Sequence, residues 1–160
     1  MASMSSEIKF SADCMLGKLC RWLRICGFDT LYSRRINDPD LMIKAQKENR
    51  VILTRDHALF NICQTKNIKA LLILHDFFED QLKQVFRELN IHPTFIISQR
   101  CLECNEILQR VIKSEIQDQV PSYIYNSQDK FYQCPACHKI FWPGTHWLQM
   151  KKKLAQIFEE

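Results

Sequence analysis

Acidic side chains stand where predicted strands end and where a predicted helix begins. Asp13 follows the stretch IKFSA, Asp56 comes two residues after the run VILT, and Asp38 and Asp40 open the helix before that run. Strand ends and helix starts meet at the carboxyl edge of a parallel sheet, so we expect these carboxylates to face one crevice. Crowded carboxylates repel one another, and Mg²⁺ or Mn²⁺ relieves the repulsion. The pattern therefore predicts a divalent metal site of Asp13, Asp38 and Asp56, with Asp40 beside them, whose chemistry suits phosphodiester hydrolysis.

Each of these aspartates also has a simpler structural interpretation. Asp13, Asp38 or Asp56 could cap the helix that follows it, because Asp is a favoured N-cap residue. Asp40 could be a solvated residue of a first helical turn, where the helix dipole favours negative charge. A cap needs only a side-chain oxygen, whereas a metal ligand needs the charge as well, so both roles remain open at this point.

Two C-x-x-C pairs have the spacing of zinc ligands: CLEC at 101–104 and CPAC at 134–137. Together they can surround one tetrahedral ion, and four protein ligands leave no open coordination position. The alternatives are a redox disulfide, or a site in which His138 or His146 replaces one cysteine. The sequence therefore predicts a structural Zn²⁺ bound by Cys101, Cys104, Cys134 and Cys137.

The long spacer between the two pairs must form an insertion or a hairpin. Within it, VPSYIYNS (120–127) has the composition of a strand. The other cysteines lie in apolar or helical stretches, and we expect them to be small buried apolar residues. They are Cys14, Cys20, Cys26 and Cys63.

Basic side chains accompany the predicted acidic site. Lys18, Arg21 and Arg24 recur at the spacing of one helix flank, and Arg55 directly precedes Asp56. Phosphates of an RNA backbone are their natural partners, although a solvated helix face is the plain alternative. The net charge of +4, from 22 Lys and Arg against 18 Asp and Glu, adds only a weak indication of an anionic partner.

The elements that must position these side chains alternate between strand and helix patterns. Such alternation predicts an α/β fold with a mostly parallel sheet and helices on both faces. Gly27 is the expected C-terminal cap of the first helix, and Asp38 is the expected N-cap of the second, with Pro39 at the first helical position. The predicted strands are 8–13, 29–33, 51–54, 70–74 and 94–98, and the predicted helices are 15–27, 38–49, 57–66 and 79–90.

From residue 100 onward the helical periodicity stops, and short β-like pieces surround the cysteine pairs. The chain closes with the basic helix LQMKKKLAQIF (148–158), which we expect to pack its apolar side on the protein although its apolar residues form no clean stripe. We predict an α/β domain over 8–98, a zinc ribbon over 99–150 and a basic C-terminal helix over 151–160.

The composition favours a folded intracellular protein. With 160 residues, 46% of them hydrophobic, the chain can build one core and a small appendage. No apolar run approaches the roughly 20 residues of a membrane helix, and the start lacks the features of a signal peptide. We expect the reducing cytoplasm or nucleus and no membrane partner; no pattern indicates an oligomeric state.

Four blocks of the chain resemble a known family. They are ADCMLGKLCRWLRICGFDTLY, DPDLMIKAQKENRVILTRD, RCLEC and CPACHKIFWPGTHWLQM, and the similarity extends from about Lys9 to Met150. The family is the Mut-seven C-terminal RNase domain family, a PIN-like nuclease domain fused to a zinc ribbon. The resemblance implies a three-layer α/β/α PIN-like fold and metal-dependent ribonuclease activity. We expect single-stranded RNA as the substrate, and the carboxylate ligands favour Mg²⁺ or Mn²⁺ at the catalytic site.

The resemblance also carries residue roles. It places Asp13, Asp38 with its neighbour Asp40, and Asp56 at the family's acidic positions. PIN-like nucleases generally use a further acidic residue after the fourth strand, for which LHDFFEDQL offers Asp76 and Asp80.

Three functions compete. The first is a metal-dependent ribonuclease whose zinc ribbon helps to bind RNA. The second is a non-catalytic RNA-binding or adaptor module, and the third is a phosphoesterase of small substrates. The intact aspartates favour the first over the second, and ribbon aromatics on which bases can stack favour it over the third, unless they only form the ribbon core. These aromatics are Tyr123, Tyr125, Tyr132, Trp142 and Trp147.

Overall fold

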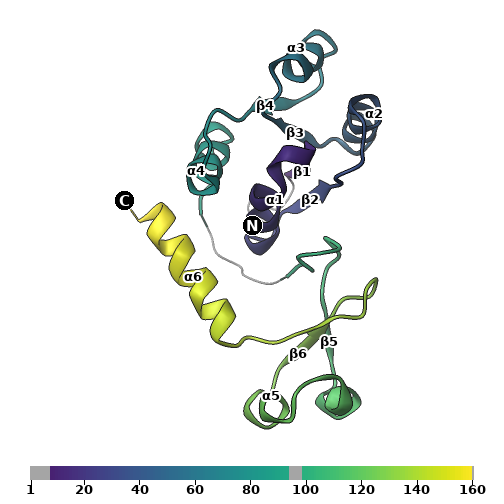
Figure 1. Cartoon of the computed structure of the whole chain (residues 1–160), viewed down its shortest axis with the longest axis vertical. Coiled ribbons are helices and arrows are strands. Elements are labelled where there is room, and N and C mark those ends of the chain that lie inside the picture. The colour runs from purple at the N-terminus through teal and green to yellow at the C-terminus, as the bar shows by residue number, and fades with distance from the viewer. Residues whose placement is uncertain (1–7, 94–98, 160) are drawn as a thin grey trace.

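The computed structural model describes residues 8–93 and 99–159, which form an α/β domain and a smaller ribbon (Figure 1). In the first domain the elements alternate as predicted, and their bounds differ from the predicted ones by a few residues. The strand predicted at 94–98 lies outside the described residues. The elements are β1 (Lys9–Ala12), η2 (Cys14–Leu16), α1 (Gly17–Ile25), β2 (Asp29–Tyr32), α2 (Asp38–Glu48), β3 (Val51–Thr54), α3 (His57–Thr65), β4 (Ala70–Leu72) and α4 (Phe78–Glu88).

The four strands form one parallel sheet in the order β2-β1-β3-β4. At the end of β1, Ala12 pairs with Tyr32 on one side and with Leu53 on the other. The carboxyl ends of the strands therefore line one side of the sheet, which we call the carboxyl edge. Asp13 and Asp56 follow β1 and β3 at this edge, where the sequence predicted them.

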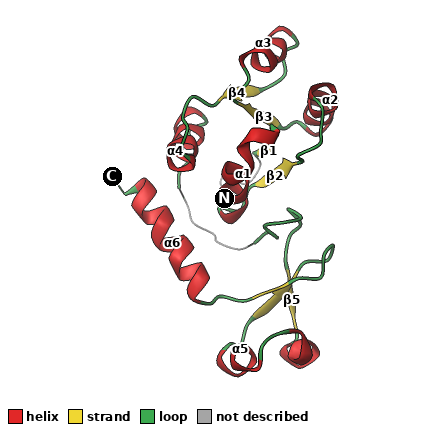
Figure 2. Cartoon of the chain, in the orientation of Figure 1, coloured by secondary structure: helices red, strands yellow, loops and turns green. Residues whose placement is uncertain are grey.

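Helices cover both faces of the sheet, which gives the predicted three-layer α/β/α arrangement (Figure 2). Leu53 belongs to the core formed with α1, α4 and the C-terminal helix, whereas Ile52 belongs to the core formed with α2 and α3. Both side chains are fully buried, which explains why β3 reads as a continuous apolar run. Trp22 of α1 stacks on Phe78 of α4 with ring centroids 5.1 Å apart, and this contact joins the two helices of one face.

The ribbon contains three short antiparallel strands in the order β5-β6-β7. Their bounds are Gln109–Val111 for β5, Phe131–Gln133 for β6 and Ile140–Phe141 for β7. Between β5 and β6 the chain forms the 3-10 helix η3 (Lys113–Gln119) and the short helix α5 (Ser122–Ser127).

The strand predicted for 120–127 is wrong, because this segment forms α5. Pro121 precedes the helix with φ at −58°, and its carbonyl accepts the N–H of Tyr125 at 3.0 Å. The fixed φ of proline suits a helix start, and this local restraint outweighs the strand propensity of the aromatic residues that follow.

The last helix, α6 (Thr145–Phe158), leads from the ribbon back to α4 (Figure 1). Its residues Met150, Leu154 and Ile157 are buried in the core on the α1 and α4 face, which confirms that this helix packs its apolar side on the protein. The helix begins before the expected position, and Leu148 is 67% exposed and outside the buried stripe. None of the helices in the described ranges is long and apolar enough to cross a membrane.

Candidate metal sites at the carboxyl edge and in the ribbon

Thr54, the last residue of β3, joins two of the predicted acidic ligands. Its fully buried hydroxyl donates to Oδ2 of Asp13 at 2.8 Å and accepts the backbone N–H of Asp56 at 3.0 Å. The side chain of Asp13 does not cap η2, so the capping interpretation of Asp13 is wrong. The sequence reasoning missed Thr54, whose only signal was its place between the apolar run and Asp56.

Asp56 is exposed at the carboxyl edge and caps α3. Its Oδ1 accepts the backbone N–H groups of Ala58 at 2.8 Å and of Leu59 at 3.2 Å. The capping interpretation therefore holds for this oxygen. A carboxylate has a second oxygen, and the cap leaves it for another partner such as a metal ion.

The start of α2 differs from the prediction by one residue. Asn37, not Asp38, is the N-cap: its Oδ1 accepts the N–H of Asp40 at 2.8 Å. Its Nδ2 donates in return to Oδ2 of Asp40 at 2.9 Å, so the two side chains are bonded to each other across the first turn of α2. Asp38 is therefore released from capping, whereas Asp40, predicted to lie beside the metal, has a structural role.

Asp38 lies close enough to Asp13 and Asp56 for their charges to act on it. Partial desolvation raises the pKa of Asp38, and the charges of Asp13 and Asp56 raise it further. A hydrogen bond with Asp13 and its charge also raise the pKa of Cys14, an exposed thiol that the sequence predicted to be buried. Asp13, Asp38 and Asp56 thus share one region of negative charge, in which a divalent cation would be stabilised. As the side chains stand in the described ranges, their oxygens do not form a ready ligand set, so binding one ion requires side-chain rotation.

The acidic residues after β4 occupy different surroundings. Asp76 accepts a 2.6 Å hydrogen bond from Nη2 of Arg55, the residue between Thr54 and Asp56, so Asp76 lies at the carboxyl edge. Asp80 lies exposed in the first turn of α4. Of the two candidates for a further acidic residue, only Asp76 contacts a residue of the carboxyl edge. The same ion pair partly neutralises the positive charge of Arg55.

The basic flank of α1 divides into exposed and buried parts. Lys18 and Arg21 are exposed, and Nζ of Lys18 lies 4.5 Å from the ring centroid of Phe78. Arg24, predicted to contact RNA, is 7% exposed and donates to the carbonyls of Thr30 at 2.9 Å and Leu102 at 2.8 Å. The prediction for Arg24 is wrong, because its guanidinium donates to carbonyl groups of the protein itself. These hydrogen bonds join α1 to the first cysteine loop.

We expect Thr54→Val to lower the free energy of unfolding by about 1–3 kcal/mol, because it leaves the Asp56 N–H and an Asp13 oxygen without their partner. Thr54→Ser keeps the hydroxyl and serves as the matched control. Urea denaturation of both variants in metal-free buffer measures the difference. Equal stability of the valine and serine variants would show that the hydrogen bonds of the hydroxyl do not stabilise the fold.

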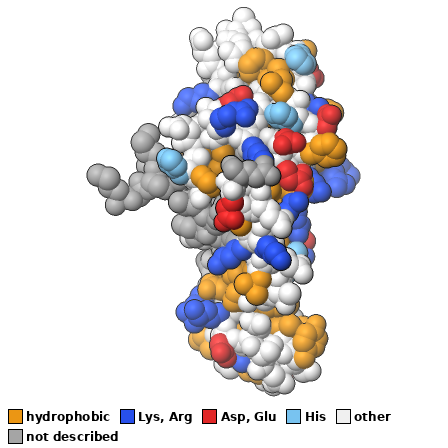
Figure 3. Space-filling model, turned by 90° about the vertical axis from the view of Figure 1, so that its left-hand side faces the viewer, with side chains coloured by type: hydrophobic (Ala, Val, Ile, Leu, Met, Phe, Trp, Pro, Cys, Tyr) orange, Lys and Arg blue, Asp and Glu red, His pale blue; other side chains and the backbone are white. Residues whose placement is uncertain are grey.

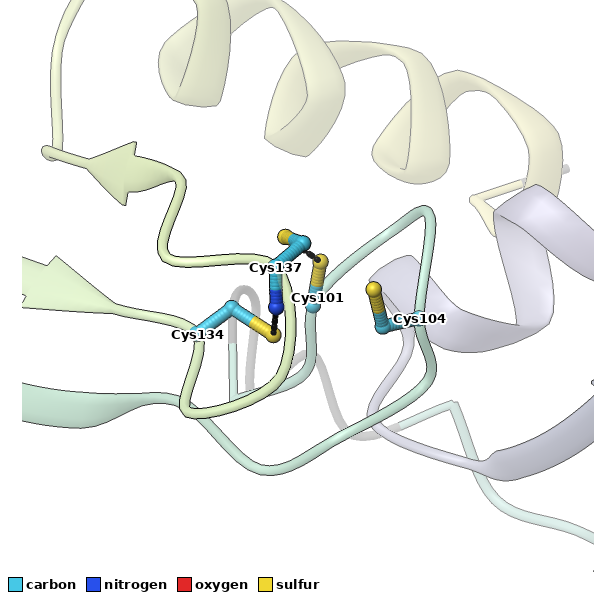
Figure 4. A group of neighbouring side chains, drawn as sticks. All are labelled: Cys101, Cys104, Cys134 and Cys137. Carbon is cyan, nitrogen blue, oxygen red and sulfur yellow. Dashed lines mark hydrogen bonds between the residues drawn. The ribbon is translucent and has the colours of Figure 1, made fainter.

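The four cysteines of the two C-x-x-C pairs converge as predicted (Figure 4). Their sulfur atoms all lie within 4.8 Å of one another, close enough to hold a metal ion such as zinc. Hydrogen bonding to Cys137 raises the pKa of Cys104 to about 12, and burial raises the pKa of Cys101. Thiolates are costly in such a cluster unless a cation compensates them, so the donor set fits a tetrahedral ion.

Both cysteine loops have the same backbone conformation. Asn105 N–H donates to the Cys101 carbonyl and His138 N–H donates to the Cys134 carbonyl, each at 2.9 Å. Both Asn105 and His138 have positive φ, at 67° and 63°, a conformation that Asn and His adopt more readily than most residues. Two equivalent turns thus present the sulfurs from opposite sides, and His138 closes its loop without acting as a ligand.

Asn105 also attaches the first cysteine loop to the α/β domain. Its Oδ1 accepts the Thr30 N–H at 2.9 Å, and its Nδ2 donates to Asp29 at 2.7 Å. Burial acts against ionisation of Asp29, but hydrogen bonds from Arg50 and Asn105 hold its pKa below the usual range. Nε of Arg100 adds a bond to the Gly27 carbonyl at 3.2 Å. The cysteine loop is therefore docked on the edge strand β2 by polar contacts that the sequence did not reveal.

Asn105→Gly should lower the free energy of unfolding by about 1–3 kcal/mol through the lost hydrogen bonds. Glycine tolerates positive φ, so backbone strain does not contribute. Asn67→Gly is the matched control, since Asn67 has φ at 55° and is exposed. Thermal denaturation of the zinc-loaded variants measures both effects, and equal losses in the two would rule out a docking role for Asn105.

The ribbon aromatics are partly structural. Tyr132 stacks on Trp147 with centroids 6.2 Å apart, Trp142 meets Phe131 edge to face, and Lys113 lies over Tyr125. Tyr123 differs, because 71% of it is exposed.

Fold and site define the class: a parallel α/β domain with an acidic carboxyl edge, fused to a four-cysteine ribbon. The chain belongs to the Mut7-C RNAse domain family, whose model matches residues 8–154. Neither a curated protein nor a solved structure matched the chain.

Proposed function

We propose that this protein is a metal-dependent ribonuclease that hydrolyses phosphodiester bonds of single-stranded RNA at the carboxyl edge. The observation that carries the proposal is the placement of Asp13 and Asp56 at neighbouring strand ends of the carboxyl edge, joined through the Thr54 hydroxyl, with Asp38 near enough for both charges to raise its pKa. Family membership supports the nuclease class and RNA as substrate.

In this proposal Asp13, Asp38 and Asp56 bind Mg²⁺ or Mn²⁺. The bound ion would lower the pKa of an attacking water and stabilise the leaving oxygen. Thr54 orients Asp13 through its 2.8 Å hydrogen bond, and the cap at the start of α3 holds Asp56 in place. Asp76 is the candidate for a fourth acidic group, and its ion pair with Arg55 must open before it could serve.

The proposed substrate contacts use the exposed cations of α1. Lys18 and Arg21 lie one turn apart and follow Asp13 in the chain, so they can bind phosphates beside the acidic edge. The ribbon, with Zn²⁺ as its structural ion, would help to hold the RNA.

A non-catalytic RNA-binding or adaptor role is the second candidate, and the capping contacts of Asp56 favour it. Asp56→Asn separates the two roles, because Asn caps as well as Asp but lacks the charge. Cleavage at the parental rate by this variant would show that Asp56 is only a cap.

The test is incubation with labelled single-stranded RNA, structured RNA and single-stranded DNA, with and without Mn²⁺ or Mg²⁺. We expect metal-dependent cleavage of single-stranded RNA that stops on chelation. Binding without cleavage under every condition would support the adaptor role, and hydrolysis of p-nitrophenyl phosphate alone would support a small-substrate phosphoesterase.

A further inference from the structure

We propose that the ribbon carries a nucleotide-binding site of its own, which takes a base and a phosphate of single-stranded RNA away from the acidic edge. The proposal deepens the proposed function and rests on it for the choice of RNA. It is carried by two adjoining pockets, one aromatic and one basic.

The aromatic pocket has a volume of about 590 Å³ and lies between α5, β7 and the start of α6. Tyr123, Phe141, Trp142 and Trp147 line it, and none of its lining residues is Asp or Glu. Its volume falls within the roughly 300–1,000 Å³ usual for small-molecule sites. Ser127, Gln128 and Thr145 add hydrogen-bonding groups to the lining.

The ring arrangement suits a base better than an aliphatic group. Trp147 is supported from one side by Tyr132 and Trp142 by Phe131, so both indoles are held in place by the ribbon. A base can stack on such fixed rings at little cost in side-chain entropy, and polar groups at the rim can meet its edge. Tyr123, although large and aromatic, is 71% exposed at this pocket, so its ring is accessible to a bound base.

The basic pocket adjoins the aromatic one and shares Lys139, Phe141, His146 and Trp147 with it. It is smaller, about 110 Å³, and its further lining includes Arg21 and Arg100. Three permanent cations stand against a single carboxylate, Glu103, which pairs with Lys139. Arg100 donates to two backbone carbonyls, and the carboxylate nearest to its charge, Asp29, is already ion-paired with Arg50 outside this pocket. A phosphate is the complementary ligand for this surplus of positive charge.

Helix α1 connects these pockets with the acidic edge. Arg21 lines the basic pocket, Lys18 lies one turn earlier, and the helix start follows Asp13 after the short η2 segment. On the face shown in Figure 3, hydrophobic side chains lie beside Lys and Arg side chains over the ribbon, at the lower end of the molecule. An RNA strand that runs along α1 can therefore reach both places at once, so affinity should rise with the length of the RNA.

The experiment is a fluorescence titration of the zinc-loaded protein, without divalent metal, using a uridine dinucleotide and an oligouridylate of about ten nucleotides. Two of the three tryptophans line the aromatic pocket, so bound bases should quench emission. We expect the longer RNA to bind more tightly. Tyr123→Ala and Arg21→Ala should each weaken its binding by about 10-fold, the order expected for one stacked base or one phosphate contact.

Two exposed ribbon residues outside both pockets give matched controls: Ile112→Ala for the apolar change and Arg110→Ala for the charge change. Both should bind RNA within about 2-fold of the parent. Equal affinity of the parent, Tyr123→Ala and Arg21→Ala would overturn the proposal. Absence of any oligonucleotide binding would overturn it as well and would leave the pocket to an apolar peptide of a partner.

Binding and cleavage separate this proposal from the ribonuclease assignment. If the parent fails to cleave RNA while binding still depends on Tyr123, the nucleotide site stands and the nuclease assignment fails. If the parent cleaves RNA while Tyr123→Ala binds it with full affinity, the nuclease assignment stands and the nucleotide site fails.

Discussion

Replacement of Asp38 by asparagine is expected to lower metal-dependent cleavage of RNA by at least about 100-fold, or roughly 2.7 kcal/mol of transition-state stabilisation. Asp38 is released from helix capping by Asn37, and its pKa is raised by partial desolvation and by the charges of Asp13 and Asp56. A neutral amide supports a divalent ion poorly, because it lacks the charge that the ion compensates. Single-turnover cleavage at saturating Mn²⁺ measures the loss.

The same variant should be at least as stable as the parent without metal. A raised pKa means that folded Asp38 holds its proton more tightly than the unfolded chain does, so the folded state loses stability as pH rises through that pKa. At neutral pH, asparagine removes the repulsion between the Asp38 carboxylate and those of Asp13 and Asp56. Thermal denaturation in chelator checks the sign, and a clear loss of stability would show that the carboxylate has a structural role instead.

Asp40→Asn is the matched control on the same helical turn. The Asp40 side chain accepts a hydrogen bond from Nδ2 of Asn37, the N-cap of α2, and is not one of the proposed metal ligands. We expect it to retain cleavage within about threefold and to lose at most the modest stability of one capping contact, about 1 kcal/mol. A loss of cleavage equal to that of Asp38→Asn would return Asp40 to the metal site.

Removal of the ribbon metal, by a strong chelator or by Cys134→Ser, is expected to unfold the ribbon while the parallel sheet stays folded. The buried cluster around the site consists of Cys101, Leu108 and Cys134, with little apolar material to replace the ion. The ribbon strands are three, three and two residues long, too short to be stable alone. Structural zinc contributes about 10–16 kcal/mol of apparent binding free energy in small zinc domains.

Hydrogen exchange gives this prediction a spatial pattern. Amides of β5, β6 and β7 should lose protection, whereas β1 and β3 should keep it because the sheet cores are built mainly from the α/β domain and α6, with only Leu102 added by the first cysteine loop. The second half of α6 should stay protected through Leu154 and Ile157. The contacts of Arg24 and Asn105 with the cysteine loop and β2 would be lost, so the α/β domain should be measurably less stable.

Zinc analysis supplies the control. Cys14→Ser changes an exposed thiol outside the cluster and should keep one zinc per chain, while Cys134→Ser should lose it. Zinc-free protein with a fully protected ribbon would contradict the structural role of the metal.

The sequence by itself determined the parallel sheet and the four thiol ligands. Both depend on signals within a few residues: an apolar run such as Val51 to Leu53, a Pro–Asp helix start, and the two-residue spacer of each C-x-x-C turn. It also determined that Asp13 and Asp56 share an edge, because equivalent ends of neighbouring parallel strands must lie side by side.

Only the tertiary structure decided which polar side chains remain available to bind a metal or RNA and which are hydrogen-bonded within the protein. Thr54 meets Asp13 across 41 residues, Arg24 meets Leu102 across 78, and Thr30 meets Asn105 across 75. An arginine on a basic helix flank gives the same sequence pattern whether its side chain faces solvent or donates to a carbonyl of a distant loop. Burial and pairing of polar groups depend on such long-range contacts, whereas sequence patterns report local periodicity. The pairing therefore appears only once neighbouring strands align and the cysteine loop docks on β2.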